Sequence, residues 1–511
     1  MTPTSVHFAR VTQVVGTTLF RARVAALGLP EVAPLVAHLA ACGVGRWLLA
    51  QDADLDHARW LLAGLRARHG QALRIDAQVL PLSQWPSAVR RAPPDLVLAA
   101  GDVSSLRLAF TAAASAGIPA LLIAPPASGA PCRALILLSP GEAEAAAVWL
   151  GEALGAGRSA ASWDWITAAP LLAGLARAIL LRGTPFARPD LEALWARGVR
   201  AVAIGGAHPF DITWAAAPSA LHARRKRMGF RDGEVRPDPP PFITPEARRG
   251  TLLVAGLGSL GSVAAEHLAP HVAALVLADP DRVDAYNPVR QAYRVADVGR
   301  PKAHALRDHL MERWTSREAT QRLSAQSAIP VVALDLACTG ERQVAELVER
   351  HGITAALVVT GAEADFAIAR ALRALDVPHV VGRCYPRARY WEAVVVDGRR
   401  GPALDDIRGR VVPGPAAPLT PEQRAAYSQD GALEAEPATL VESGWAAAWL
   451  ARIAAQLLAP AGLRERWLLE VLGAGRTCLV GGVGVEHTEH GPAYGVALPG
   501  QIHAWGRGSI A

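Results

Sequence analysis

The pattern of apolar and polar positions repeats along this chain. In residues 23–54 a short apolar run is followed by a helical pattern and a second apolar run, and residues 251–281 repeat that order. Further on, residues 95–124 and 355–383 each carry an apolar run, a polar turn, a helical pattern and another apolar run. Such units are typical of doubly wound parallel sheets. The pattern therefore predicts an α/β protein made of two tandem Rossmann-like domains.

A proline-rich stretch at residues 236–241 separates the two copies, and prolines so closely spaced interrupt both helices and central strands. With 511 residues, the chain exceeds the roughly 250–300 residues at which single cores stop growing. The C-terminal part carries helical patterns at 437–458 and 462–472 and then short apolar runs that predict strands. We expect a first domain at 1–230, a linker at 231–248, a second domain at 249–415, and a small α+β region at 416–511 that completes the second domain.

Composition excludes several classes of protein. The formal charge is +6, but the densest basic run, residues 224–227, is typical of a solvated face, and no nucleic-acid-binding motif accompanies it. No stretch is long and apolar enough to span a bilayer, and no secretion signal pattern opens the chain. The five cysteines include no CxxC pair, which argues against a disulfide framework or a cysteine-built zinc site. We expect a cytoplasmic protein that binds neither nucleic acid nor membrane.

A glycine motif opens the second copy. Gly256, Gly258 and Gly261 follow an apolar run and precede a helical pattern, a context in which the backbone can approach a phosphate at a helix N-terminus. Asp279 ends the next apolar run, where its carboxylate can accept hydrogen bonds from ribose hydroxyls. These features indicate a nucleotide site. A tight packing turn explains the glycines equally well, and an NAD-dependent dehydrogenase shares both features.

The residues after Asp279 separate these alternatives. Asp281, Asn287, Arg290, Gln291 and Lys302 stand in the order D-x-D, N-x-x-R-Q and G-x-x-K. This pattern resembles the ubiquitin-activating enzymes and the ThiF- and MoeB-like adenylyltransferases. A triphosphate attacked at its α-phosphorus needs fixed cations beside the attacking oxygen and the departing pyrophosphate. Arg290 and Lys302 suit that role, with Asn287 as a further catalytic residue, and the resemblance implies ATP binding through the glycines, both aspartates and Gln291.

The resemblance also implies a magnesium ligand. In the family an aspartate in a D-N-x-x-x-R context follows the next strand, and Asp365 and Arg370 match it, although Phe366 replaces the usual asparagine. Mg²⁺ bound partly through substrate phosphates needs only one or two carboxylates. We therefore expect Asp365 to bind Mg²⁺, with Glu363 as the second choice. The structural alternative is that Asp365 caps the helix that follows.

The first copy lacks this equipment. Gly28, Pro30 and Ala33 stand where the second copy has its three glycines, and no N-x-x-R-Q or G-x-x-K follows. The resemblance implies an inactive domain that pairs with the active one as an internal pseudo-dimer and lends an arginine to ATP. Arg21 or Arg23 lies near the family's position for that arginine. The chain can also assemble further, as a homodimer or a heterocomplex.

The usual acceptor cysteine is missing. Residues 385–477 contain no cysteine, and Ala403 stands where many relatives have the nucleophile. Three explanations stay open: the reaction stops at the adenylate, Cys478 or Cys384 acts from an unusual place, or Ala403 replaces a native cysteine. The tail histidines His487 and His490 are better explained by a polar surface turn than by a metal site. We therefore expect no metal site in this tail.

The resemblance implies adenylation of the C-terminal carboxylate of a ubiquitin-like protein, followed by transfer to an acceptor such as a conjugating enzyme. The fused pair of domains is most similar to activating enzymes of bacterial ubiquitin-like conjugation operons, some of them antiviral. One alternative is adenylation of a peptide in ribosomal natural-product biosynthesis. A second is a non-catalytic scaffold that binds a leader peptide. An NAD-dependent dehydrogenase comes last.

Overall fold

The computed structural model divides the chain into two compact units, Met1–Pro241 with Thr439–Val441 and Phe242–Ala438 with Glu442–Ala511. The expected linker at 231–248 lies outside the residues that the structure describes. Those residues are 17–51, 55–126, 132–139, 163–185, 187, 189–204, 212–215, 249–315, 329–361, 364–384, 390–407, 439–459, 464–473, 478–482, 485–488, 491–494 and 501–505.

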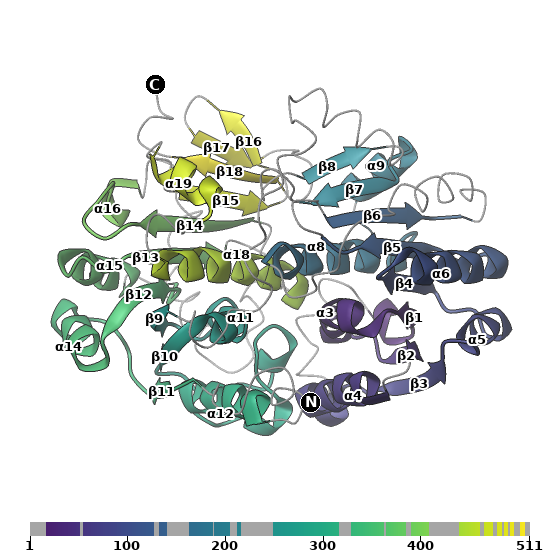
Figure 1. Cartoon of the computed structure of the whole chain (residues 1–511), viewed down its shortest axis with the longest axis horizontal. Helices are drawn as coiled ribbons and strands as arrows, with labels where there is room; N and C mark the ends of the chain where they lie inside the picture. Colours follow the sequence, from purple (N-terminus) through teal and green to yellow (C-terminus); the bar gives the residue numbers. More distant parts are fainter. Residues whose placement is uncertain are drawn as a thin grey trace. The chain divides into compact units, whose positions relative to one another are not determined.

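The first unit contains one mixed sheet (Figure 1). Its first five strands in spatial order run parallel, and the last three are antiparallel. The central strands at 96–100 and 120–124 are buried along their whole length, and the strand at 23–27 is buried except at Arg23, as expected when helices cover both faces of a parallel sheet. The spatial order is β3 (Asp76–Pro81), β2 (Arg46–Gln51), β1 (Arg23–Leu27), β4 (Leu96–Ala100), β5 (Ala120–Ala124), β6 (Cys132–Leu137), β7 (Ala201–Ile204) and β8 (Ile212–Ala215).

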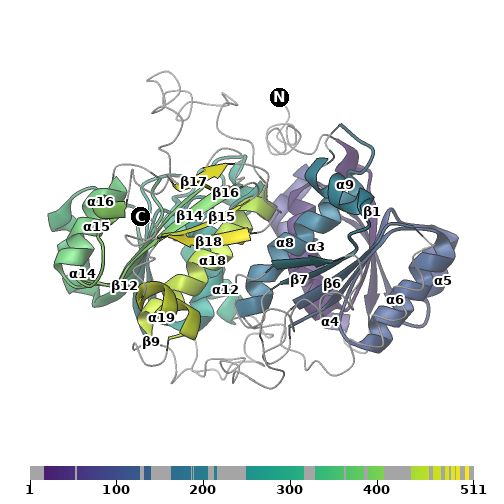
Figure 2. The same ribbon diagram turned by 90° about the horizontal axis from the view of Figure 1, so that it is seen from above.

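Helices cover both faces of this sheet. Three helices pack against one another on one face of the sheet, and Figure 2 shows two others on the opposite face. The first group is α3 (Leu29–Ala41), α4 (Leu55–His69) and α8 (Trp163–Leu180); the second is α5 (Trp85–Arg91) and α6 (Val103–Ala116). The remaining elements are α9 (Pro189–Ala196), η1 (Thr18–Phe20) and η2 (Gly70–Ala72).

The second unit repeats the same strand order. Five strands are again parallel, and three antiparallel strands extend the sheet. The order is β11 (Val331–Leu334), β10 (Val272–Ala278), β9 (Arg249–Ala255), β12 (Ile353–Val358), β13 (His379–Cys384), β14 (Tyr390–Val396), β15 (Cys478–Gly482) and β18 (Gln501–Trp505). Two sheets of one topology in one chain confirm the predicted α/β fold of tandem Rossmann-like domains.

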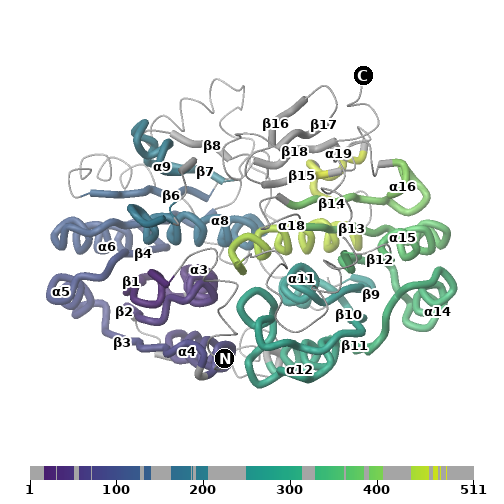
Figure 3. Tube along the Cα trace, turned by 180° about the vertical axis from the view of Figure 1, so that it is seen from behind, coloured from purple at the N-terminus to yellow at the C-terminus, as the bar shows by residue number. Residues whose placement is uncertain are grey.

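Helices also cover both faces of the second sheet, as Figure 3 shows. One face packs against α14 (Glu341–His351), α15 (Ala364–Ala374) and α16 (Leu404–Ile407) through an apolar cluster that includes Leu253 and Ile368. On the other side lie α11 (Gly261–Leu268), followed by η5 (Ala269–His271), and α12 (Lys302–Thr315). Among the helices of the described residues, none combines the length and apolar character needed to cross a membrane.

The C-terminal part adds helices and strands to the second unit. Helix α18 (Leu440–Leu458) and helix α19 (Arg466–Gly473) begin later than the patterns suggested. Between them Arg452 forms a buried ion pair with Glu465 at 2.8 Å, and the rings of Trp449 and Trp467 lie against its guanidinium. Strands β15 and β18 join the main sheet, while β16 (Val485–Thr488) and β17 (Gly491–Tyr494) form a separate hairpin. The small α+β composition expected here is present.

Candidate active site

The glycine turn, residues 256–261, joins β9 to α11. Gly256 has a φ of +91°, and a Cβ there would lie 2.6 Å from the carbonyl oxygen of Val359. A Cβ on Gly261 would lie 1.9 Å from the Gly256 carbonyl oxygen. These two glycines hold the turn tightly against the end of β12. A Cβ on Gly258, by contrast, would meet nothing within 4 Å. The turn therefore leaves open space before the N-terminus of α11, which fits a phosphate group.

Asp279 supports the turn from the end of β10. One of its carboxylate oxygens accepts a hydrogen bond from the Leu257 amide at 2.5 Å, and the other accepts one from the Asp281 amide at 2.8 Å. The buried Tyr293 hydroxyl donates to the Leu257 carbonyl at 2.8 Å. Burial raises the pKa of Asp279, and the nearby charge of Lys302 opposes this. Asp279 thus places a carboxylate at the carboxyl edge of the sheet, beside the turn.

Lys302 brings an ammonium group to the same edge. It begins α12, is only 7% exposed, and its backbone amide donates to the Asp281 carbonyl at 2.9 Å. Its Nζ lies 2.7 Å from Asp281 Oδ2 and 3.9 Å from Asp279 Oδ1. The two aspartates and the lysine, predicted from the sequence as site residues, therefore lie together.

Arg290 follows a short 3₁₀ turn, η6 (Asn287–Val289). Asn287 is buried and shapes this turn: its Oδ1 accepts from the Asp284 amide at 2.9 Å, and its carbonyl accepts from the amides of Arg290 and Gln291. Burial raises the pKa of the Cys384 thiol to about 12, and the charge of Arg290 partly opposes that rise. The charge of Arg290 therefore acts on the thiol at the end of β13. These contacts of Asn287 shape the turn, and its catalytic role stays a prediction.

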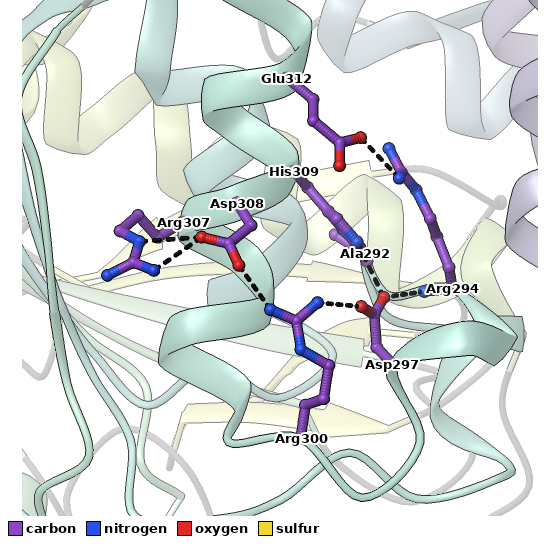
Figure 4. Close-up of polar contacts among 8 residues, drawn as sticks. All are labelled: Ala292, Arg294, Asp297, Arg300, Arg307, Asp308, His309 and Glu312. Carbon is purple, nitrogen blue, oxygen red and sulfur yellow. Dashed lines mark hydrogen bonds and ion pairs between the residues drawn. The ribbon is translucent and has the colours of Figure 1, made fainter.

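A cluster of polar residues, here called the clamp, joins the segment between Arg290 and Lys302 to α12 (Figure 4). The sequence patterns did not indicate these residues. His309 is buried, with Nδ1 3.0 Å from the Ala292 carbonyl oxygen and Nε2 2.8 Å from Asp297 Oδ2. Both partners are hydrogen-bond acceptors, so both bonds form only when each ring nitrogen carries a proton. Arg300 joins the cluster by donating to Asp297 at 2.9 Å and to Asp308 at 2.5 Å. The clamp holds the chain between Arg290 and Lys302 at both of its ends.

A hydroxyl links the clamp to the glycine turn. Ser262 Oγ donates to the Gly258 carbonyl at 2.6 Å and accepts from the Ala292 amide at 3.1 Å. Ser262 directly follows the last glycine of the motif, so its position beside the turn could have been predicted from the sequence. Nothing in the sequence marked Tyr293, Asp297 or His309, because their partners come from distant positions.

The Asp297 carboxylate gives this clamp a predicted pH dependence. Burial acts to raise its pKa, but hydrogen bonds from His309, the Arg294 amide and Arg300 outweigh burial and lower it. The carboxylate therefore stabilises the fold above its unfolded pKa of roughly 3.9, and that stability is lost as the pH falls through the lower folded value. We expect Asp297→Asn to destabilise the protein by about 3 kcal/mol at neutral pH and to flatten the acid limb of stability. Denaturant unfolding between pH 3 and 7 measures both.

The matched control is Glu346→Gln on the exposed face of α14, where the carboxylate pairs with Arg342. Its unfolding free energy should stay within about 0.5 kcal/mol of the wild type. An acid limb unchanged in Asp297→Asn would contradict the assignment of the pH dependence to this carboxylate.

Asp365 lies fully buried in the first turn of α15. Its Oδ1 accepts from the backbone amide of Thr360 at 3.1 Å and from the Thr360 hydroxyl at 2.5 Å, while its Oδ2 lies 2.7 Å from the Arg383 guanidinium. The residues that the structure describes contain no group of three or more histidine, cysteine or acidic side chains able to hold a metal. A guanidinium bound to the carboxylate also repels a divalent cation. The observed surroundings of Asp365 therefore do not fit Mg²⁺.

Two other residues belong to the expected metal motif. Glu363, the second choice as ligand, lies outside the described residues. Arg370 points its guanidinium to Asp405, with two contacts of 3.0 Å. The D-N-x-x-x-R spacing is kept, but its arginine serves the link between α15 and α16.

The first unit has no counterpart of the open turn. Gly28 has a φ of +81°, and a Cβ there would lie 1.8 Å from the Ala100 carbonyl oxygen, which parallels Gly256. Helix α3 begins at the next residue, so Pro30 lies inside the helix instead of in a loop. Arg23 donates to the Ala92 carbonyl at 2.9 Å within its own unit, and Arg21 is exposed just after η1. A role for either arginine toward ATP stays a prediction.

The cysteine environments bear on acyl transfer. Cys42, Cys132 and Cys338 are buried, and desolvation raises the pKa of Cys132 and, to about 11, that of Cys338. Although Cys384 as a residue is exposed, protein atoms surround its thiol closely enough to raise its pKa, as described above. Thiols with raised pKa values are poor nucleophiles at neutral pH. Cys478 belongs to β15, opposite Val394, but its side chain lies outside the described part of the structure.

Ala403 and the tail histidines complete the set of residues considered in the sequence. Ala403 directly precedes α16, and its amide donates to Asp406 at 3.0 Å. His487 lies in strand β16 opposite Pro492 and not in the expected surface turn, and His490 falls outside the described residues.

Residues 244–349 match the model of the ThiF family. The second unit thus contains a ThiF family domain. The matched range includes the glycine turn, Asp279, Arg290 and Lys302, whereas Asp365 and Arg383 lie beyond it. The match confirms the suspected adenylyltransferase superfamily and supports ATP-dependent adenylation of a carboxylate as the general chemistry.

Solved structures of E. coli MccB resemble this chain over part of its length. The complex of MccB with MccA-N7isoASN has 14% sequence identity and a TM-score of 0.34, covering 52% of this chain and 67% of that one. The complex with AMPCPP and SeMeT MccA has 12% identity and a TM-score of 0.35, and the ATP complex has 12% and 0.34; each covers 52% of this chain and 66% of its own. The match thus spans about two thirds of those chains. No curated protein matches the sequence.

Proposed function

We propose that the second unit uses ATP to adenylate the C-terminal carboxylate of a ubiquitin-like protein. One observation carries the proposal: Lys302 and Arg290, from separate segments, bring positive charge to the carboxyl edge of the sheet, where the turn at Gly258 is open. Parallel sheets bind their ligands at this edge. The ThiF domain match supports the same general chemistry.

The proposed reaction forms one bond and breaks another. An oxygen of the substrate carboxylate attacks the α-phosphorus of ATP, the bond to the bridging oxygen of the β-phosphate breaks, and pyrophosphate leaves. Negative charge moves from the carboxylate to the departing group, so fixed cations along that path stabilise the transition state. Lys302 is held by Asp281, so its ammonium does not have to be ordered during the reaction, and the turn that Asn287 shapes fixes the backbone of Arg290.

Asp279 and the glycine turn position the nucleotide in this proposal. The open space at Gly258 accommodates phosphate, with the N-terminus of α11 next to it. Asp279 still has lone pairs able to accept from ribose hydroxyls. Its hydrogen bond from the Leu257 amide fixes the ribose position relative to the phosphate position.

We further propose that the acyl adenylate passes directly to a separate acceptor, such as a conjugating-enzyme-like protein. The raised thiol pKa values of Cys338 and Cys384 support this over a thioester on either residue. Cys478 stays a candidate nucleophile. A Cys478→Ala variant that still transfers the acyl group would favour direct transfer.

ATP–pyrophosphate exchange tests the proposed function. Exchange should rise at least about tenfold when a ubiquitin-like protein encoded beside this chain is added. The same protein ending in a carboxamide should give no increase, because its terminus lacks the attacking oxygen. Exchange stimulated by a short peptide acid but not by any folded protein would support peptide adenylation instead. No exchange with either substrate would overturn the proposal.

A further inference from the structure

Two buried hydroxyls fix successive peptide groups of the glycine turn. Tyr293 is fully buried, and its hydroxyl donates to the Leu257 carbonyl at 2.8 Å. Ser262 is also fully buried, and its Oγ donates to the Gly258 carbonyl at 2.6 Å. The same Oγ accepts a hydrogen bond from the Ala292 amide at 3.1 Å. The turn is thereby joined to the segment that follows Arg290 and held in one conformation.

The Tyr293 hydroxyl keeps its proton in this environment. Burial raises the pKa of Tyr293 well above its ordinary value, and the negative charge of Asp279 adds to the rise. The hydroxyl therefore stays in the neutral form, in which it can donate to the Leu257 carbonyl. A phenylalanine ring could fill the same space, but it would take this donor away from a buried carbonyl group.

The two hydroxyls also determine where the neighbouring backbone amides point. In a planar trans peptide group the carbonyl and the N–H of the next residue point in opposite directions. Because the Leu257 carbonyl faces the Tyr293 hydroxyl, the Gly258 N–H points away from it. Because the Gly258 carbonyl faces Ser262, the Ser259 N–H points away from α11. Each hydroxyl thus sets the direction of one amide that it does not touch.

These two amides lie on the open side of the turn. Gly258 and Ser259 are partly exposed, whereas Leu257 and Leu260, which flank them, are buried. Among the residues that the structure describes, no hydrogen-bond acceptor pairs with the amide of Gly258 or of Ser259. A Cβ on Gly258 would meet nothing within 4 Å, so a ligand can approach the backbone here. Two adjacent N–H donors are therefore held in place just before α11.

We propose that Tyr293 and Ser262 are positioning residues, which aim two backbone amides of the glycine turn at a phosphate group of ATP. The amides are those of Gly258 and Ser259, and successive backbone N–H groups of this kind bind anions. Neither hydroxyl contacts the phosphate, because each acts through the peptide group that it holds. The inference rests on the proposed function, since it concerns the same site.

Calorimetric titration with a non-hydrolysable ATP analogue and with adenosine tests the inference. Tyr293→Phe should weaken binding of the analogue by roughly tenfold, the lower end of the range for a hydrogen bond to a charged group. Its affinity for adenosine, measured by competition with the analogue, should stay within about twofold of the wild type, because adenosine has no phosphate to accept from the amides. A role in packing alone would change both affinities together or neither.

Two further variants keep the test independent of folding. In Ser262→Ala the Gly258 carbonyl keeps its bond from the backbone amide of residue 262, so the analogue should bind only about threefold more weakly, again with adenosine unchanged. The matched control is Tyr286→Phe, whose hydroxyl donates to Asp284 at 2.9 Å and does not contact the turn. This control should bind both ligands as the wild type does. Melting temperatures report whether each variant is folded.

The outcomes separate this inference from the proposed function. Equal weakening of both ligands in Tyr293→Phe, or unchanged binding of the analogue, overturns the inference and leaves adenylation standing. If Tyr293→Phe does not fold, the same comparison in Ser262→Ala decides. A wild-type chain that does not bind the analogue overturns both and favours a non-catalytic scaffold.

Discussion

Replacing Lys302 by alanine is expected to reduce ATP–pyrophosphate exchange by roughly 100- to 1000-fold, the usual cost of removing one preorganised charged donor from a reaction site. The ammonium lies 2.7 Å from Asp281 and 3.9 Å from Asp279, so its position beside the glycine turn is set before substrate binds. Exchange rates at saturating ATP and substrate measure the effect. Lys302→Arg should recover part of the activity, because the charge returns with a different shape.

The matched control is Arg342→Ala. This arginine is 93% exposed on α14 and pairs with Glu346 one helical turn away, so removing it takes one positive charge from the same unit without touching the edge of the sheet. Exchange should stay within about twofold of the wild type. An equal loss in both variants, or no loss in Lys302→Ala, would contradict a direct role for Lys302.

Gly258→Val is expected to lower ATP affinity by about 100-fold while leaving the fold intact. A Cβ at this position meets no atom within 4 Å, and the backbone is not in the left-handed region, so the unfolding free energy should change by no more than about 1 kcal/mol. The added side chain fills the space in which the proposed phosphate lies. Calorimetric titration with ATP and thermal unfolding measure the two effects separately.

Valine substitutions at two other glycines are the controls for Gly258→Val. Gly340→Val, at the start of α14, also meets open space, and it should change neither affinity nor stability appreciably. Gly261→Val places a side chain against the Gly256 carbonyl and should destabilise the unit outright. Undiminished ATP binding in Gly258→Val would show that the open turn is not the phosphate site.

Several features of the site could be predicted because they depend on short stretches of sequence. The glycine turn and Asp279 follow successive strands, and parallel strands bring their carboxyl ends to one edge of a sheet. Lys302 lies 21 residues after Asp281, at the start of the next long helix of the same βα unit, so its ammonium reaches the aspartates once the intervening chain folds back. The two copies of the strand order were visible for the same reason, since periodicity is a local property.

Other features could not be predicted, because they depend on contacts between residues far apart in the sequence. Arg383 lies 18 residues from Asp365, and only the pairing of β12 with β13 brings its guanidinium to the carboxylate. The spacing of Asp365 and Arg370 matched a metal motif, yet the partner that surrounds Asp365 comes from a different strand. His309 and Asp297 meet for a similar reason, across the loop that precedes α12.

The sequence by itself therefore determined the tandem α/β architecture, the nucleotide-like turn and the two cations of the second unit, because each is written in local periodicity and short spacing. Only the tertiary structure decided which carboxylates are engaged and by which cations. A side chain's charge environment depends on the strands and helices packed around it, and those neighbours come from positions that no local pattern connects.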